Sequence, residues 1–183
     1  MRTVERWNKV IRGIFIKQFT PRIQRDLIQI PDLPIKPDID SCFISGEPGT
    51  GKTIHACLLF LSEQRNLYLS EMTADCEFIS VSTLIEKIKA SFDTKEGLTE
   101  HQILEHYSTV HLLILDDFGT LKCTDWVYQT LYLIINNRYE QMKKTIITSN
   151  LNLEQLASQL GDDRITSRIE RMCKIIHKKP WNG

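Results

Sequence analysis

Several features that would assign this chain of 183 residues to a special class are absent from its sequence. Eight Gly and six Pro are too few for a collagen-like or low-complexity chain. No run of 18 apolar residues occurs, so the sequence predicts no membrane-spanning helix. The charged start MRTVERWNKVIRG has no apolar stretch of the kind that a signal peptide needs. The composition, 42% hydrophobic and 25% charged, is that of an ordinary globular domain.

The cysteines form no CxxC pair and are odd in number, which argues against a disulfide framework. They stand at Cys42, Cys57, Cys76, Cys123 and Cys173. Three of them, Cys42, Cys57 and Cys173, lie beside apolar residues, as buried thiols do. Cys173 and His177 are four residues apart and could share a helix face, but two ligands do not make a zinc site. We therefore expect a reduced, cytoplasmic protein.

The net charge is zero, but the charges are unevenly distributed along the chain. Residues 1–25 hold seven Lys and Arg against one acidic residue, and residues 164–183 hold six against one. The segment between them holds ten basic and 21 acidic residues. Two basic ends around an acidic body indicate an anionic partner or, equally well, two solvated helix faces.

The hydrophobic pattern changes near residue 40. Residues 3–17 predict a basic amphipathic helix, because apolar side chains repeat at helical spacing at Val4, Trp7, Ile11 and Ile14. A second short helix is expected over 21–28, where Pro stands at the first position. The segment PDLPIKPDID, 31–40, is expected to be a linker. The sequence therefore predicts a basic helical segment with its linker over 1–40 and one domain over 41–183.

Beyond residue 40, short apolar strands alternate with helices. Strands are expected at 41–46, 76–81, 111–115, 145–150 and 173–177. Helices are expected at 53–64, 83–92 with Ser82 as its cap, 98–107, 126–142, 151–160 and 164–172. This alternation is typical of an α/β fold with a parallel sheet, here of five strands flanked by helices.

The segment GEPGTGKT, 46–53, fits the phosphate-binding pattern GxxxxGK[ST] and lies between an expected strand and an expected helix. In such a loop the glycines let the backbone approach phosphates, and the helix N-terminus attracts their charge. Lys52 is expected to reach the β- and γ-phosphates, and the Thr53 hydroxyl to bind Mg²⁺. The candidate nucleotide-binding residues are Gly46, Glu47, Pro48, Gly49, Thr50, Gly51, Lys52 and Thr53. The sequence thus predicts a P-loop NTPase that binds ATP and Mg²⁺.

A second acidic motif, LLILDD, occupies 112–117. Its apolar run predicts a buried strand, so that Asp116 emerges at the carboxyl end, where ligands bind in open α/β folds. There Asp116 can bind Mg²⁺ together with Thr53. Asp117 is the candidate for orienting the attacking water. The alternative is an ordinary turn at the end of a strand.

In this order, the motifs resemble the AAA+ ATPase domain of the DnaC/IstB group of bacterial helicase loaders. The resemblance covers 42–177 and rests on GEPGTGKT, FISVSTLIEKIKASF, LLILDDFG, IINNRYE, TIITSNLNLEQL and DDRITSRI. It implies an AAA+ core that hydrolyses ATP with Mg²⁺. It also implies a homo-oligomer that acts on single-stranded DNA, with a replicative helicase or another replication protein as partner, and no association with a membrane.

The resemblance also implies roles for particular residues. Asn150 matches the sensor residue that contacts the γ-phosphate or the attacking water, its alternative being a cap for the next helix. Arg164 and Arg168 match the segment that carries an arginine finger, which acts on ATP held by a neighbouring subunit; the alternative is a basic surface stripe. Which of the two reaches the phosphate stays open. In the helix pair near DNA, the basic candidates are Lys87, Lys89 and Lys95.

The chain departs from the group in three respects. Only about 40 residues precede the core, where helicase loaders usually carry a separate domain that grips the helicase. No helical lid with a second sensor arginine is expected after the last strand. Asp117 stands where many AAA+ proteins have Glu, and the shorter side chain predicts slow turnover, which suits a switch better than a motor.

Other functions remain open. One is an IstB-like transposition helper that acts on duplex DNA. Another is an ATP-binding interaction module with negligible turnover, in which Trp7 anchors a docking helix, unless that helix packs on the protein's own core. A kinase is disfavoured because KKPWNG is too short for a lid. Tyrosines 128, 132 and 139 should lie near one helix face, as core or interface residues more often than as a base-stacking platform.

Overall fold

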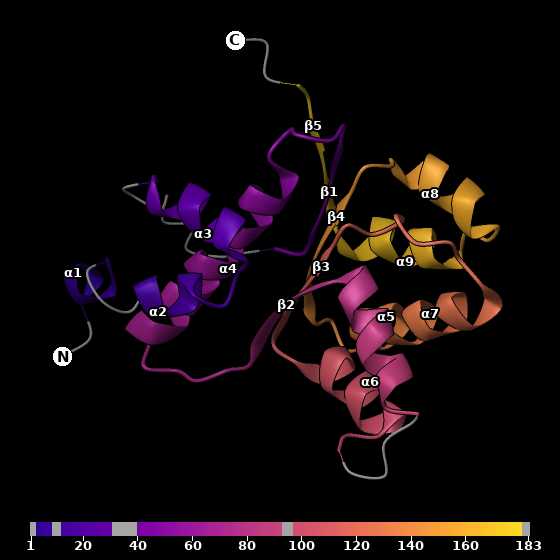
Figure 1. Ribbon diagram of the computed structural model, residues 1–183, viewed down its shortest axis with the longest axis horizontal. Coiled ribbons are helices and arrows are strands. Elements are labelled where there is room, and N and C mark those ends of the chain that lie inside the picture. The colour runs from indigo at the N-terminus through magenta and orange to yellow at the C-terminus, as the bar shows by residue number, and fades with distance from the viewer. Residues whose placement is uncertain (1–2, 9–11, 31–39, 93–96, 181–183) are drawn as a thin grey trace.

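The computed structural model describes residues 3–8, 12–30, 40–92 and 97–180. Its centre is a parallel sheet of five strands in the order β2-β3-β4-β1-β5 (Figure 1). The strands are β1 (Cys42–Gly46), β2 (Cys76–Ser80), β3 (Leu112–Asp116), β4 (Lys144–Ser149) and β5 (Lys174–Lys178). All residues of β1 and β3 are buried, as expected for central strands covered on both faces. The predicted α/β fold with a five-stranded parallel sheet is confirmed.

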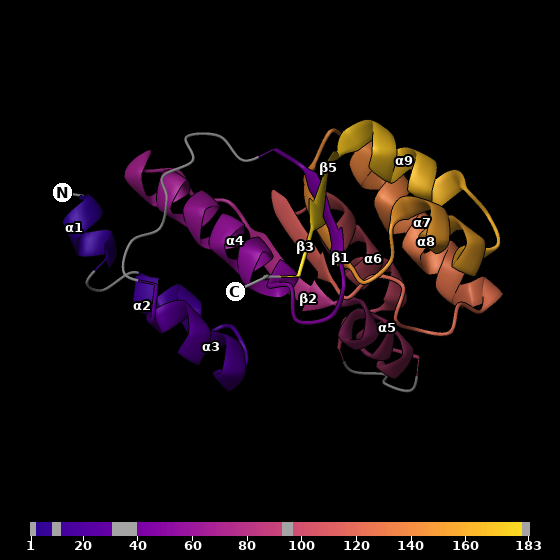
Figure 2. The ribbon, with the colours of Figure 1, turned by 90° about the horizontal axis from the view of Figure 1, so that it is seen from above.

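Helices cover both faces of the sheet, so that the molecule has three layers (Figure 2). One face is covered by α4 (Lys52–Leu69), onto which α2 (Arg12–Ile16) and α3 (Pro21–Ile28) pack. The other face carries α5 (Val81–Ala90), α6 (Glu100–Thr109), α7 (Asp125–Glu140), α8 (Leu153–Leu160) and α9 (Arg164–Met172). A hydrophobic core fills the space on each side of the sheet. Of the described helices, none is both long and apolar enough to cross a lipid bilayer.

The register of the strands brings polar residues together at one edge of the sheet. Ser45 of β1 lies opposite Ser149 of β4, and Ser80 of β2 opposite Asp116 of β3. Because all strands are parallel, their carboxyl ends meet at this edge, where open α/β sheets bind their ligands. The glycine-rich motif lies in the loop after β1, and the acidic motif ends in the turn after β3. The two therefore lie close together at the carboxyl edge of the sheet.

The N-terminal segment packs on the protein itself. Within the expected helix over 3–17, the structure has α1 (Val4–Arg6) and α2, with residues 9–11 outside the described part. Trp7 is fully buried, with its ring stacked on Phe15 at 5.5 Å and tilted against Tyr68 of α4 at 5.8 Å. The hypothesis that Trp7 is an exposed docking anchor is therefore wrong. The expected linker lies almost wholly outside the described residues.

Two local predictions need correction. Ser80, not Ser82, caps α5: its hydroxyl accepts the amide of Thr83, and the helix begins directly after β2. Cys173 ends α9 while His177 lies in β5, so the two do not share a helix face. Among the described residues, no group of three or more His, Cys, Asp or Glu side chains could hold a metal ion by itself. The helix expected at 53–64 continues to Leu69 as α4, whereas the other elements beyond residue 40 match the expected ones within about two residues, and α3 and α9 match them fully.

All five cysteines are free thiols. Cys42, Cys57 and Cys173 are buried, as their apolar neighbours predict, whereas Cys76 and Cys123 are partly exposed. Burial raises the pKa of the Cys57 and Cys173 thiols, and it raises the pKa of Cys76 to about 12. These thiols therefore serve as small apolar side chains and not as nucleophiles.

Candidate nucleotide-binding site

The loop between β1 and α4 depends on glycine at both of its ends. Gly46 has a φ of +148°, and a Cβ there would collide with the carbonyl oxygen of Lys178 on the neighbouring strand β5. Gly51, with a φ of +78°, is the N-cap of α4 and provides no side-chain cap. The first amides of α4 therefore have neither an intrahelical acceptor nor a capping side chain. A helix N-terminus of this kind is a binding site for anions.

Lys52 bridges the loop from within. Its side chain is buried, and its Nζ donates hydrogen bonds to the carbonyl oxygens of Gly46 and Glu47, both at 2.8 Å. Burial lowers the pKa of Lys52, whereas the negative charges of Asp117 and Asp116 act in the opposite direction. The ammonium group of Lys52 thus lies between the phosphate-binding loop and the acidic turn that carries Asp116 and Asp117.

Asp116 is the buried centre of the acidic turn. Thr148 of β4 donates a hydrogen bond to Asp116 Oδ1 at 2.6 Å, and the hydroxyl of Thr53 lies 3.0 Å from the same oxygen. Burial raises the pKa of Asp116, and the hydrogen bond from Thr148 partly offsets this. A carboxylate and a hydroxyl side by side are the hard oxygen ligands that Mg²⁺ uses when phosphate oxygens and water complete its shell. The residues present fit a magnesium ion held jointly with a nucleotide.

Asp117 follows in a strained conformation that points its exposed carboxylate into the same pocket. Its φ is +58°, which is uncommon for any residue other than glycine. The turn is fixed by Thr148: its hydroxyl accepts the amide of Asp117 at 3.0 Å, and its carbonyl accepts the amide of Phe118 at 2.8 Å. Phe118 is fully buried and anchors the turn. Strain held in this way is common at functional sites.

These groups line one pocket of about 500 Å³. From the sequence-predicted set it contains Pro48, Gly49, Gly51, Lys52, Thr53, Asp116, Asp117 and Asn150. Three residues of the predicted phosphate-binding loop do not line it: Gly46 and Glu47 accept the hydrogen bonds of Lys52, and the hydroxyl of Thr50 donates to the carbonyl of Glu47 at 2.8 Å. They shape the loop instead.

Asn150 does not cap the following helix. Asn152 does so: its side chain accepts the amide of Gln155 at 2.8 Å, and the side chain of Gln155 accepts the amide of Asn152 in return. Asn150 is exposed and faces the pocket from the end of β4, next to the acidic turn. This leaves its amide available for a ligand, as the sensor role requires.

Sequence reasoning missed two contributions to the pocket. The first is Thr148, which connects Asp116 to Asp117; among the polar residues of β4, KTIITS, nothing in the sequence singles it out. The second is the side of the pocket formed by α3 and the residue before it, namely Thr20, Arg22, Ile23 and Asp26. No local signal could have indicated it, because the approach of α3 to the loop depends on tertiary packing.

The two candidate finger arginines do not line this pocket. Arg164 and Arg168 lie on α9 and face the tyrosines of α7. The rings of Tyr128 and Tyr132 stack with centroids 6.3 Å apart, and Tyr128 is buried. The tyrosines therefore belong to the packing between α7 and α9, as predicted, and are not a base-stacking platform.

The profile of one protein family, described as IstB-like ATP binding protein, matches residues 21–182. The chain belongs to this IstB-like family. ATP binding is thus the property of the family, and the pocket between β1, β3 and α3 is where this chain has the geometry for it. The AAA+ core of the DnaC/IstB group, expected from the motifs, is confirmed.

Individual relatives agree with this assignment. The IstB-like chain is 27% identical over 140 residues to an uncharacterized protein, YqaM, of Bacillus subtilis (strain 168), a match that covers 74% of this chain and 41% of the relative. It is 27% identical over 132 residues to the replicative helicase loader DnaC of Buchnera aphidicola subsp. Acyrthosiphon pisum, covering 72% of this chain and 51% of the relative. The chain thus spans about half the length of these relatives or less.

A crystal structure of the DnaC helicase loader superposes on this IstB-like chain with a TM-score of 0.63 and 26% sequence identity. The superposition covers 90% of this chain and 96% of the other. The two chains therefore share most of their fold.

Proposed function

We propose that this protein is an ATP-dependent switch in DNA replication, similar in its task to a replicative helicase loader. It binds and hydrolyses ATP with Mg²⁺ in an oligomer, and it acts on single-stranded DNA together with a replicative helicase or another replication protein. The observation that carries the ATPase part is the convergence of Lys52, Thr53, Asp116 and Asp117 in one pocket. A role in replication implies a cytoplasmic protein.

Binding of ATP follows from the charges around the loop. The open N-terminus of α4 and the ammonium group of Lys52 attract the phosphates. When phosphates enter, Lys52 exchanges two carbonyl acceptors for charged oxygens, which form stronger hydrogen bonds. Thr53 and Asp116 would hold Mg²⁺, which neutralises charge on the phosphates.

Hydrolysis needs a group that orients water, and Asp117 is the candidate. Its carboxylate is exposed to the pocket, and its direction is fixed by the hydrogen bonds of Thr148. Asn150 can donate a hydrogen bond to the γ-phosphate or to that water. We expect slow turnover, because aspartate is one methylene shorter than the glutamate of many AAA+ proteins.

Binding of single-stranded DNA is proposed for the end of α5. Phe92 is about half exposed, and its ring meets Trp126 edge-on at 5.6 Å. Lys89 lies over the Trp126 ring, with its Nζ 5.7 Å from the centroid. Exposed aromatic rings beside a cation suit stacked bases and their phosphates. Lys87 is less available because it donates a hydrogen bond to the hydroxyl of Tyr107 at 3.0 Å, and Lys95 lies outside the described residues.

The partner and the division of the chain are proposed from the relatives. One relative is named a replicative helicase loader, which suggests a helicase as the partner. We propose 41–183 as the ATPase core and 1–40 as an N-terminal segment. Since α2 and α3 pack on α4, this segment would act as part of the core rather than as a separate arm.

The test is ATP hydrolysis by the wild type and by Lys52→Ala, with and without single-stranded DNA, over a range of protein concentrations. We expect specific turnover that rises with both DNA and protein concentration and is lost in the variant. Tight ATP binding without turnover under any condition would instead identify an interaction module. Stimulation by duplex DNA but not by single strands would favour the transposition helper, which the family name also fits.

A further inference from the structure

The two arginines of α9 are held in different ways, although both lie over tyrosine rings of α7. The guanidinium carbon of Arg164 lies 5.5 Å from the ring centre of Tyr128 and 5.1 Å from that of Tyr132. The guanidinium carbon of Arg168 lies 5.4 Å from the ring centre of Tyr139. Both arginines are therefore oriented by cation–π contacts within the chain.

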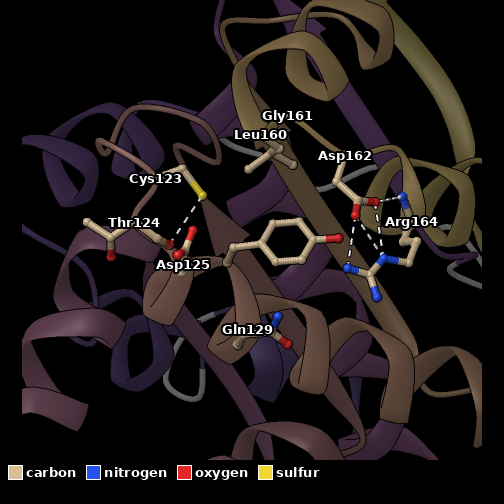
Figure 3. A pocket seen from close by; sticks show the side chains of 9 residues that line it. Cys123, Thr124, Asp125, Gln129, Leu160, Gly161, Asp162 and Arg164 are labelled. Atoms are coloured by element: carbon tan, nitrogen blue, oxygen red, sulfur yellow. Dashed lines mark hydrogen bonds and ion pairs between the residues drawn. The ribbon is translucent and has the colours of Figure 1, made fainter.

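Arg164 forms an ion pair with Asp162 through its Nε and Nη2 (Figure 3). Its Nε and Nη2 each lie 2.9 Å from Asp162 Oδ2, and its backbone amide donates to Asp162 Oδ1 at 2.7 Å. The pKa of Asp162 is lowered, mainly by that backbone hydrogen bond. The charge of Arg164 is thus already matched by a carboxylate of its own chain, and a phosphate would have to compete with that carboxylate for it.

Arg168 is held at one end only. Its Nε donates to Asn136 Oδ1 of α7 at 3.1 Å, and its side chain is partly exposed. In the part of the chain that the structure describes, no carboxylate or carbonyl accepts a hydrogen bond from its two terminal nitrogens. The guanidinium is thus fixed in direction while the nitrogens of its outer edge stay free to donate.

We propose that Asn136 and Tyr139 are positioning residues for Arg168, the one of the two candidate arginines that serves as the finger expected from the family resemblance, while Arg164 braces α9 against α7. This inference rests on the proposed ATPase function. The recipient of the finger is a second copy because Arg168 does not line the pocket of its own chain. A free arginine side chain loses rotamer entropy when it is fixed, so holding Arg168 in place before assembly favours its insertion.

The test uses mixtures of two inactive proteins. Asp117→Asn keeps the loop that binds ATP and keeps Arg168, whereas Arg168→Ala keeps an intact site and lacks the donor. Each alone is expected to lose turnover, by about a thousandfold for Arg168→Ala. Their mixture should regain turnover, because an intact site of the Arg168→Ala protein receives Arg168 wherever its neighbour is the Asp117→Asn protein. The variant Arg164→Ala, assayed alone, should keep most of the wild-type turnover.

The role of Asn136 is tested by adding Asn136→Ala to the donor that carries Asp117→Asn. We expect the recovered kcat to fall about tenfold with an unchanged KM for ATP, since about 1.4 kcal/mol of positioning is lost. Asn136→Asp, which keeps an acceptor for Nε, should restore it. The matched control is Asn137→Ala, because Asn137 is the next residue and its Nδ2 donates to Ser108 instead, at 3.4 Å.

Each outcome decides between the two proposals. Full recovery of turnover with the Asn136→Ala donor, or an equal loss with the Asn137→Ala donor, would overturn the positioning role while leaving the ATPase function intact. Loss of activity in Arg164→Ala but not in Arg168→Ala would reverse the assignment of the two arginines. A wild type without turnover under any condition would refute the proposed function, and the inference with it.

Discussion

Asp116 combines a functional position with an unfavourable environment. The side chain is buried beside a second carboxylate, and burial raises its pKa despite hydrogen bonds from Thr148 and Thr53. The folded protein therefore binds a proton at Asp116 more tightly than the unfolded chain does. It follows that the ionised carboxylate lowers the free energy of unfolding, and that this penalty is full above the raised pKa and absent below the ordinary one.

We predict that Asp116→Asn stabilises the protein without Mg²⁺ or nucleotide at pH 7, by about 1 kcal/mol. An amide keeps the acceptor for Thr148 and removes the buried charge. The gain should shrink as the pH falls toward the ordinary pKa of a carboxyl group. Urea unfolding of the wild type and the variant measures the gain in stability at pH 7. The same measurement at the lowest pH where the wild type stays folded shows how far the gain shrinks. Asp117→Asn is the control, since that exposed carboxylate should change stability by less than about 0.5 kcal/mol.

At the scale of single residues, the sequence identified most of the site but not its support. Lys52, Thr53, Asp116 and Asp117 are recognisable because phosphate and Mg²⁺ chemistry restricts both residue type and spacing. Thr148 escaped recognition because its role arises only when β4 pairs with β3. Asn150 and Asn152 compete for the cap of α8 in the sequence, and only the path of the backbone decides for Asn152.

At the scale of the elements, Arg138 connects three of them. It is fully buried in α7 and donates to Thr145 Oγ1 at 2.9 Å and to the carbonyls of Tyr107, Val110 and Lys144. Burial lowers its pKa to about 10, so it still carries its charge at pH 7. The guanidinium thus joins the end of α6 to α7 and β4 by a set of hydrogen bonds that no other side chain can form.

We predict that Arg138→Lys destabilises the protein by about 2 kcal/mol or more, because an ammonium on a flexible stem cannot reach all four acceptors and leaves buried carbonyls unpaired. Arg138→Met should cost more. Urea midpoints measure both losses. The neighbouring exposed residue Glu140 gives the control, since Glu140→Gln should be nearly neutral. A variant Arg138→Lys as stable as the wild type would contradict this account of the buried cluster.

The helix α3 adds a second cation, Arg22, to the nucleotide pocket that Lys52 of the phosphate-binding loop also lines. Arg22 is exposed and lines the pocket together with Lys52 and Thr53, whereas Arg25 of the same helix pairs with Asp26 at 3.2 Å and does not line it. A phosphate-bearing ligand in the pocket should therefore interact with Arg22 and not with Arg25. In this way α3 would respond to the nucleotide.

We predict that Arg22→Ala weakens ATP binding about tenfold, which corresponds to about 1.4 kcal/mol, as for one charge-assisted hydrogen bond. Arg25→Ala carries the same change of charge on the same helix and should leave the affinity unchanged. Fluorescent nucleotide titration at two salt concentrations measures the difference. Equal affinities for the two variants would show that α3 merely lies near the pocket.

The elements themselves were largely predictable, for identifiable reasons. Pro21 marks the start of α3, and the apolar runs of β1 and β3 are typical of central strands. The end of α4 was not predictable: the helix runs on to Leu69, Ser70 is its C-cap, and the φ of +58° at the following Glu71 has no signal in the local sequence. The contact of α3 with the pocket depends on the same kind of non-local packing.

At the scale of the whole molecule, the proposed function divides the site into a part held by one chain and a part that a second copy would supply. Lys52, Thr53 and Asp116 lie in one pocket, and Arg168 lies on α9, away from that pocket. Binding of ATP should therefore be a property of the single chain, while hydrolysis should require assembly. The two processes should respond to different substitutions.

This division predicts the thermal unfolding of dilute protein with Mg²⁺ and ATP at about 100 times its dissociation constant. Ligand binding at that excess stabilises the folded state by about 2.7 kcal/mol. For a chain of this size, this corresponds to a rise in Tm of roughly 5 to 10 °C. Lys52→Ala should lose the rise, because the phosphates lose their cation. Arg168→Ala should keep it in full, although it is expected to abolish turnover. A variant Arg168→Ala without the rise would mean that Arg168 acts on ATP within its own chain, and that the pocket of one protomer is complete.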